Sequence, residues 1–399
     1  MTKYLKFITI FISIILLSGC QNYQEINNYA IVSGISIDKS NEENKYTVGI
    51  QIMNAKKDEE SDNSLITFYK SDGNTIYEAL QRITLDSPKE LYLGHNEVVV
   101  ISEDLLKEKD PLNYLDYFMR DSKIEKDSLV MIAKDDKAYE ILKIITPLET
   151  IPSRNLKSTL SVADTYSGIL TIVTIDEFIS DLSNKGKEAV LPSVSITGKK
   201  KDGDKMENIA ESDPEAKLEF KTLGFFKNNK LVDYLTKDES VGYNFLSNTQ
   251  NQTYVNLKCD DTNYASIKIS KSKTEDKLSF KANEPAVKII SNIQATLLEY
   301  NCKADFIKDE DYIKDLEKKA ASKIKKLMQK TTDKLYKENK TDALKYGTKF
   351  YEKKYKQMKK LGYKKNTIAN DITFTFKVKV DITSTELSIR SVKENNYER

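Results

Sequence analysis

The thiol of Cys20 is the side chain in this sequence that is most clearly placed for chemistry. Small residues precede it in the tetrapeptide Leu17-Ser18-Gly19-Cys20, and small residues let an extended backbone enter a peptidase cleft. An apolar run over residues 7–17 lies behind Lys3 and Lys6. The run is shorter than the ~20 apolar residues that span a bilayer, and it has the length and flanks of the hydrophobic segment of a signal peptide.

This arrangement resembles a bacterial lipobox. We predict that residues 1–19 are a signal peptide and that Cys20 carries a diacylglycerol thioether and an acylated amino group. Several acyl chains on one residue anchor a protein stably to a membrane. The expected location is the outer face of a bacterial cytoplasmic membrane. The alternative is an ordinary signal peptide followed by a cysteine that occurs there by chance.

His95, Cys259 and Cys302 are the other candidate site residues. His95 is the single histidine, and we expect a structural residue, hydrogen-bonded at the Gly94 bend. A pH- or ligand-sensitive switch is the alternative, because histidine titrates near neutrality. For Cys259 and Cys302 we expect two buried free thiols. They could instead form a disulfide if their strands are neighbours and their Cα atoms lie within ~7 Å.

The composition argues against most catalytic and nucleic-acid-binding functions. One histidine excludes sites that need two, and no G-x-S-x-G motif accompanies it. The formal net charge of +2 over 399 residues provides no basic field for nucleic acid. Acidic residues cluster at Glu59, Glu60 and Asp62, but their spacing matches no EF-hand, so a solvated loop is expected rather than a calcium site. We therefore predict no catalytic residues, no metal, no cofactor and no nucleic acid partner.

Hydrophobic patterning predicts mixed secondary structure in the first half of the chain. Residues 30–38 and 45–53 are runs rich in β-branched residues that suit a hairpin, and Val98–Ile101 are four apolar residues that suggest a strand buried on both faces. Thr174-x-x-Glu177 is a capping box at the start of a helix. A strand over residues 189–197 should lie on a sheet edge if it includes Pro192.

The second half alternates strands with long amphipathic helices. Asn228-Asn229 predicts a tight hairpin. Apolar residues from Ile313 to Leu335 recur every three or four positions and predict one long helix. A second helix is expected over residues 341–361, with Tyr351 and Tyr355 facing inward. Residues 372–382 alternate between apolar and polar, which predicts an antiparallel sheet with one wet face and one face covered by helices.

These elements predict a multi-domain α+β (mixed α/β) protein. Residues 20–198 would form an N-terminal region with a mixed sheet and helices. Residues 199–216 carry many charges and almost no apolar side chain, so we expect a linker there. Residues 217–399 would form a C-terminal antiparallel sheet covered by long helices.

Three segments together resemble the Ger(x)C lipoproteins, the C subunits of bacterial spore germinant receptors. They are residues 25–38 after Cys20, the Leu91-Tyr92-Leu93-Gly94-His95 sequence before the Val98–Ile101 run, and residues 223–243 with Leu223-Gly224-Phe225-Phe226-Lys227 and Glu239-Ser240-Val241-Gly242-Tyr243. The order and spacing of all three carry the resemblance. Gln21 departs from the family's Trp after the cysteine, and Lys345-Tyr346-Gly347 departs from its Gly-Phe-Gly.

The resemblance implies a non-enzymatic role in spore germination. Such a C subunit works in the spore inner membrane with an A-type membrane subunit and a transporter-like B-type subunit. Function as an extracytoplasmic assembly or signalling partner of these subunits is therefore expected. The alternative is a lipid-anchored substrate-binding protein or a structural envelope lipoprotein. Repeated βαβ units in two lobes would favour the substrate-binding protein.

Overall fold

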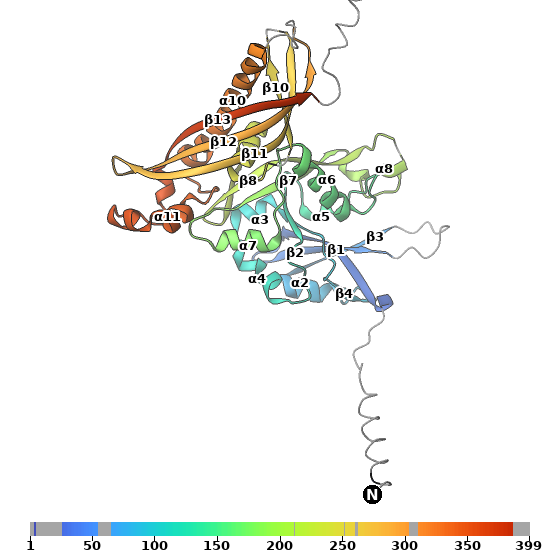
Figure 1. The fold of residues 1–399 in the computed structure, drawn as a ribbon. Helices are drawn as coiled ribbons and strands as arrows, with labels where there is room; N and C mark the ends of the chain where they lie inside the picture. Colours follow the sequence, from blue (N-terminus) through green and yellow to red (C-terminus); the bar gives the residue numbers. More distant parts are fainter. Residues whose placement is uncertain are drawn as a thin grey trace, which may run out of the picture.

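The computed structural model describes Tyr4 and residues 26–54, 65–210, 212–250, 252–259, 262–302 and 310–385. Cys20 and the acidic residues Glu59, Glu60 and Asp62 lie outside these ranges. Two mixed sheets with helices make up the described part of the chain, which confirms the predicted α+β class (Figure 1).

The first sheet has nine strands in the order β3-β2-β1-β5-β6-β7-β8-β9, with β4 added beside β1. The pairs from β1 through β7 are parallel, as is β1 with β4, and the outer pairs are antiparallel. The strands are β1 (Tyr29–Lys39), β2 (Tyr46–Met53), β3 (Ile66–Gly73), β4 (Glu90–Tyr92), β5 (Val98–Ser102), β6 (Leu129–Ala133), β7 (Val190–Gly198), β8 (Ala216–Lys227) and β9 (Lys230–Tyr234).

Helices cover both faces of this sheet, and the central strands are buried on both sides. Val98 and Val100 of β5 face one apolar cluster, whereas Val99 and Ile101 face another. The prediction of a doubly buried strand is therefore confirmed. The helices of this region are η1 (Ile26–Asn28), α2 (Ile76–Ile83), α3 (Glu103–Glu108), α4 (Leu112–Arg120), α5 (Ala138–Ile141), α6 (Pro152–Tyr166) and α7 (Ile175–Ser183). The capping box predicted at Thr174 and Glu177 is present at the start of α7.

A β-bulge in β1 changes which residues face the core. The pairing of β1 with β2 shifts between Val32 and Gly34. Ala30 and Val32 before the bulge, and Ile35 and Ile37 after it, all join the same apolar cluster. The extra residue shifts the alternation by one position, as a bulge does.

Pro192 lies in a central strand, so the prediction of an edge strand was wrong. β7 pairs with β6 on one side and with β8 on the other. The pairing with β8 is irregular between Pro192 and Val194, and the pairing with β6 begins only at Ser193. Proline is tolerated here because a bulge does not require every backbone N–H of the ladder.

The segment 199–216 connects two neighbouring strands of the same sheet. It holds the short helices η2 (Lys200–Asp202) and α8 (Glu207–Ala210), and β8 then returns antiparallel to β7. Asn228 and Asn229 have positive φ angles of 49° and 61°, and they turn β8 into β9 as the hairpin prediction required. The boundary between the two sheets in the structure therefore falls after β9.

The second sheet has four strands, in the order β10 (Thr253–Lys258), β11 (Tyr264–Lys281), β12 (Glu284–Tyr300) and β13 (Thr373–Thr385). The first three strands pair antiparallel, but β13 pairs parallel to β12. The prediction of an antiparallel sheet is therefore wrong for its last pair. The chain passes through helices between β12 and β13, and such a crossover connection returns a strand in the parallel direction.

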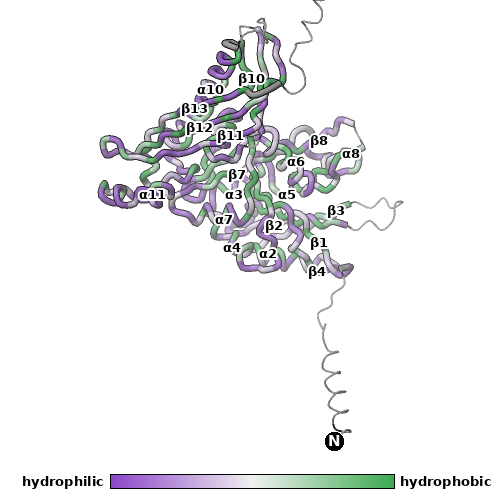
Figure 2. Tube along the Cα trace, viewed as in Figure 1, coloured by the Kyte–Doolittle hydropathy of each residue, from purple (hydrophilic) through white to green (hydrophobic). Residues whose placement is uncertain are grey.

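One face of this sheet is covered by helices. They are α9 (Lys237–Ser247), α10 (Glu310–Thr332), its continuation η3 (Asp333–Glu338), α11 (Tyr346–Lys360) and η4 (Ile368–Asp371). The predicted apolar stripe of α10 is confirmed, since Leu316, Ala320 and Ile324 are fully buried. Tyr351 and Tyr355 of α11 are exposed, so their inward prediction was wrong. The tube of Figure 2 shows that α11 is mostly hydrophilic.

The two sheets share one of the apolar clusters. It contains Val98 and Met131 of the first sheet together with Ile267, Ile289 and the buried side of α10. The other cluster belongs to the first sheet and its helices alone. The junction between the sheets is therefore apolar core rather than an open interface.

Candidate functional site

The predicted site residues lie in different parts of the molecule. His95 lies in the connection between β4 and β5, at the amino ends of the parallel strands of the first sheet. Cys259 and Cys302 lie beside the second sheet, just beyond the ends of β10 and β12. The structure does not bring His95 together with the cysteines.

His95 belongs to a small charged group around Glu97. Its Nε2 lies 3.5 Å from Oε1 of Glu97, and the same oxygen lies 3.5 Å from Nε of Arg154 at the start of α6. The side chain of Glu97 is only 13% exposed, whereas that of His95 is 47% exposed. A structural role for His95, hydrogen-bonded at the Gly94 bend, stays a prediction, and Gly94 itself is required by close packing at this bend. A Cβ on Gly94 would lie 2.8 Å from the Tyr92 hydroxyl and 2.9 Å from the Lys123 carbonyl oxygen.

Backbone hydrogen bonds fix this connection between neighbouring strands. The N–H of Glu97 donates to the carbonyl of Ser33, and the N–H of Leu129 donates to the carbonyl of Glu97. Beside it, Nδ2 of the buried Asn96 donates to the Ser128 hydroxyl over 3.0 Å. The Leu91–His95 motif thus shapes a rigid surface turn that carries the exposed imidazole of His95.

The carboxyl ends of the parallel strands, where open α/β sheets bind ligands, carry two buried aspartates. Asp38 at the end of β1 accepts hydrogen bonds from the N–H groups of Ala138 and Tyr139, at 2.7 and 3.0 Å. Burial raises the pKa of Asp38 to about 6. The carboxylate of Asp136 accepts a hydrogen bond from the N–H of Ile196 and forms an ion pair with Lys200. Both carboxylates are occupied in holding backbone, so the geometry suits structure rather than proton transfer.

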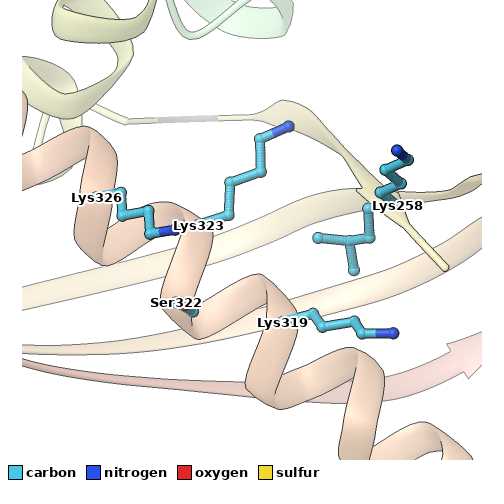
Figure 3. Close-up of a pocket in the computed structure, with 6 residues that line it drawn as sticks. Lys258, Lys319, Ser322, Lys323 and Lys326 are labelled. Atoms are coloured by element: carbon cyan, nitrogen blue, oxygen red, sulfur yellow. The ribbon is translucent and has the colours of Figure 1, made fainter. Parts of the chain in front are cut away.

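A basic groove runs between α10 and β10 in the second sheet. Its volume is about 280 Å³, and its lining residues are Leu257, Lys258, Lys319, Ser322, Lys323 and Lys326. Figure 3 shows Lys319, Lys323 and Lys326 leaving α10, with Lys258 across from them. Lys323 donates to the carbonyl of Asn256 and Lys319 to that of Cys259, at 2.8 and 3.4 Å. These lysines tie α10 to the outer edge of β10, and they give the groove an attraction for anions.

A disulfide joins Cys259 and Cys302, whose Cα atoms are 6.0 Å apart. The preferred interpretation of two buried free thiols is therefore wrong, and both cysteines are only half-buried. The N–H of Cys259 donates to the carbonyl of Asn263, and β11 pairs with both β10 and β12. The bond links the two strands that flank β11.

No group of three or more His, Cys, Asp or Glu side chains that could hold a metal ion occurs among the residues that the structure describes. Within those residues, no helix has both the length and the apolar content needed to cross a membrane.

Two family models match consecutive parts of the chain. "Spore germination protein N-terminal domain" matches residues 22–196, and "Spore germination B3/GerAC like, C-terminal" matches residues 221–386. The chain belongs to this family of spore germination proteins. This confirms the resemblance drawn from the sequence, and as a member of the family the chain is not an enzyme.

Relatives of known name cover nearly the whole chain. Spore germination protein KC of Bacillus subtilis (strain 168) is 28% identical over 370 residues, which cover 90% of each chain. Spore germination protein B3 of the same organism is 24% identical, covering 85% of this chain and 86% of the relative. The crystal structure of the GerBC protein aligns with a TM-score of 0.54 at 19% identity, covering 88% of this chain and 96% of that one. The GerBC likeness shows that the two share a fold.

The third segment of the family resemblance, residues 223–243, runs from β8 and β9 of the first sheet into α9, which packs on α10 of the second sheet. Gly242 of α9 packs against α10, where an added Cβ would lie 2.2 Å from Oγ1 of Thr331 and 2.4 Å from the Leu327 carbonyl oxygen. The Thr331 hydroxyl donates to the carbonyl of Glu239 over 2.7 Å. Asn244 donates to the carbonyls of Gly168 and Leu170, both at 2.9 Å, beyond the end of α6.

The departure at Lys345-Tyr346-Gly347 also lies at the junction of the sheets. The buried carboxylate of Asp342 accepts the Tyr336 hydroxyl and the N–H groups of Tyr346 and Gly347, all at 2.7–2.8 Å. Its burial raises its pKa. The N–H of Glu188, in the loop between α7 and β7, donates to the Asp342 carbonyl over 3.0 Å. The side chain of Asp342 therefore fixes a turn of the second region, and the backbone of this turn is hydrogen-bonded to the loop that precedes β7 of the first sheet.

Sequence reasoning missed Glu97, Arg154, Asp38 and Asp342. A carboxylate within an apolar strand was a usable signal for Asp38, since a buried charge needs partners. The other three give no local signal, because their partners come from distant parts of the sequence.

Proposed function

We propose that this protein is the lipid-anchored C subunit of a nutrient germinant receptor in the spore inner membrane. In this proposal Cys20 carries the diacylglycerol, and the body formed by the two sheets assembles with A-type and B-type membrane subunits. The observation that carries the proposal is the pair of family matches, which together begin at residue 22, two residues after Cys20. The turn around Glu97 and the basic groove supply surfaces for assembly rather than for catalysis.

The anchor is tested by Cys20→Ala in a sporulating strain, with the variant Cys259→Ser, Cys302→Ser as the matched control because it keeps Cys20. We expect Cys20→Ala to abolish incorporation of labelled fatty acid and to release the protein from the membrane fraction. The control should remain labelled. Labelling and fractionation unchanged by Cys20→Ala would contradict the anchor.

Assembly is tested by capture of the tagged protein from detergent-solubilised spore membranes. We expect the A-type and B-type subunits in the wild-type eluate, identified by mass spectrometry, and slower nutrient-triggered germination in the Cys20→Ala strain. Recovery of neither subunit, with germination unchanged, would leave a structural envelope lipoprotein as the better description.

A further inference from the structure

The start of the first sheet lies close in the chain to the proposed anchor. Ile26, where η1 begins, is six residues after Cys20. Six extended residues reach at most about 20 Å. If Cys20 is acylated, the surface around the start of β1 is therefore held beside the bilayer. The inference that follows rests on the proposed function and extends it from an anchor to an orientation.

Strand β4 and the connection that precedes it surround the start of β1. Tyr29 pairs with Glu90, and Ile31 pairs with Tyr92. The rings of Tyr29 and Tyr92 are 5.6 Å apart, and Tyr92 is 41% exposed. In Figure 1 the start of β1, β4 and α2 lie together at one end of the molecule, and β10 and α10 lie at the other end.

The connection between α2 and β4, residues 84–89, exposes a large aliphatic side chain. Leu85 is 85% exposed and comes directly after Thr84, the residue that caps the end of α2. A single exposed leucine is ordinary on a protein surface. Here it accompanies a tyrosine pair, and tyrosine is enriched where proteins meet the headgroup region of a bilayer.

The charges of this surface are mixed in sign. Lys123 lies 3.9 Å from Glu90, and Lys89 is followed directly by Glu90 and preceded by Asp86. A surface of this kind has no strong preference for anionic lipids, in contrast to a polybasic segment. Contact with a bilayer would therefore depend on Leu85 and the tyrosines and on the closeness of the anchor.

We propose that this end of the molecule rests on the membrane. Leu85 inserts at the boundary of headgroups and acyl chains, and the Tyr29–Tyr92 pair lies at headgroup level. The basic groove between α10 and β10 then faces away from the bilayer. A protein partner covering Leu85 is the competing occupant, and the following test separates the two.

The absence of tryptophan from the sequence allows single-site fluorescence probes. Leu85→Trp places a probe at the proposed contact. Tyr254→Trp on β10, 65% exposed at the other end of the molecule, is the matched control. Each full-length lipidated variant is reconstituted into phosphatidylcholine vesicles with and without lipids brominated on the acyl chains.

We expect Leu85→Trp to emit at shorter wavelength in vesicles and to be quenched about twofold by the brominated lipid, because an interfacial indole lies near the acyl chains. Tyr254→Trp should be unaffected. Replacing part of the phosphatidylcholine by phosphatidylglycerol should leave both results unchanged. An unquenched Leu85→Trp on floating vesicles would overturn the lipid contact and favour a protein partner. Equal quenching of both variants would overturn the fixed orientation.

Flotation of the wild-type protein separates this inference from the proposed function. If wild-type protein fails to float with the vesicles, the anchor at Cys20 is wrong. If it floats and Leu85→Trp is unquenched, the orientation alone is wrong. Tyr92→Trp provides a second probe of the same surface should the Leu85 variant fold poorly, and we expect it to be quenched as well.

Discussion

The two sheets of this protein bury their apolar side chains in different ways. The first sheet has helices on both faces, so strands such as β5 and β6 are buried along their whole length. The second sheet has helices on one face only, and β13 alternates between inward Phe374 and Phe376 and exposed Thr375 and Lys377. The difference teaches that a short continuous apolar run and a long alternating run indicate different layer arrangements.

The largest expected effect lies in the doubly covered sheet. Ile132→Ala in β6 removes a fully buried side chain, so we expect a loss of about 2–5 kcal/mol in the free energy of unfolding. Lys377→Ala on the wet face of β13 should change it by less than about 0.5 kcal/mol. Denaturant unfolding of the two variants measures the contrast. Similar losses in both would show that the two sheets are not covered differently.

The second sheet should depend more on its covalent link. Replacing Cys259 and Cys302 by Ser opens a loop with a sequence separation of 43 residues, and we expect a loss of about 2–4 kcal/mol. Hydrogen exchange should show faster opening of β10 and the end of β12, with the first sheet unaffected. Mass spectrometry of the alkylated, unreduced wild-type protein checks the bond itself. Two alkylated thiols would disprove it.

Asp38 should make the first sheet sensitive to pH. Its pKa is raised to about 6 because burial disfavours the charged carboxylate. Between about pH 4 and pH 6 the unfolded chain has lost this proton while the folded chain still holds it. The free energy of unfolding should therefore fall as pH rises across this window, by about 3 kcal/mol in total.

Asp38→Asn should remove this slope. Urea unfolding from pH 4 to pH 7.5 measures it, and the exposed Asp86→Asn is the control that should keep the wild-type slope. Parallel pH profiles for wild type and Asp38→Asn would mean that Asp38 is ionised throughout this range.

The smallest expected effect concerns the contact between α9 and α10. Helix propensity alone predicts that Gly242→Ala is stabilising by about 1 kcal/mol. The close approach to Leu327 and Thr331 predicts a loss of about 1–3 kcal/mol instead. The sign of the change in thermal midpoint decides between them. A gain would show that α9 and α10 pack less tightly at this point than the structure indicates.

Much of the fold could be predicted from local patterns. The Val98–Ile101 run, the stripe of α10, the capping box of α7 and the Asn228-Asn229 turn each contain their own signal, because neighbouring residues determine them. The direction of β13 had a signal that was overlooked, since helices lie between β12 and β13 and a parallel return follows from that. Alternation by itself does not encode strand direction.

Other features depend on contacts that no local pattern records. The bulge in β1 and the position of Pro192 are set by partners on both sides of each strand. The pairing of Cys259 with Cys302 required knowing that both flank β11. Helix α6 begins with Pro152 at its first position, which is a usable start signal. The rest of this helix has too few apolar residues to show a helical pattern in the sequence. Of the candidate site, the sequence identified His95 but not the carboxylate and guanidinium beside it.

The apolar cluster that both sheets share has a mechanical consequence. Bending between two bodies requires a seam whose contacts can slide, and interlocked side chains in a close-packed core resist sliding. A force applied to one sheet is therefore expected to move both sheets together as one rigid body. The orientation of the second sheet relative to the first should stay fixed.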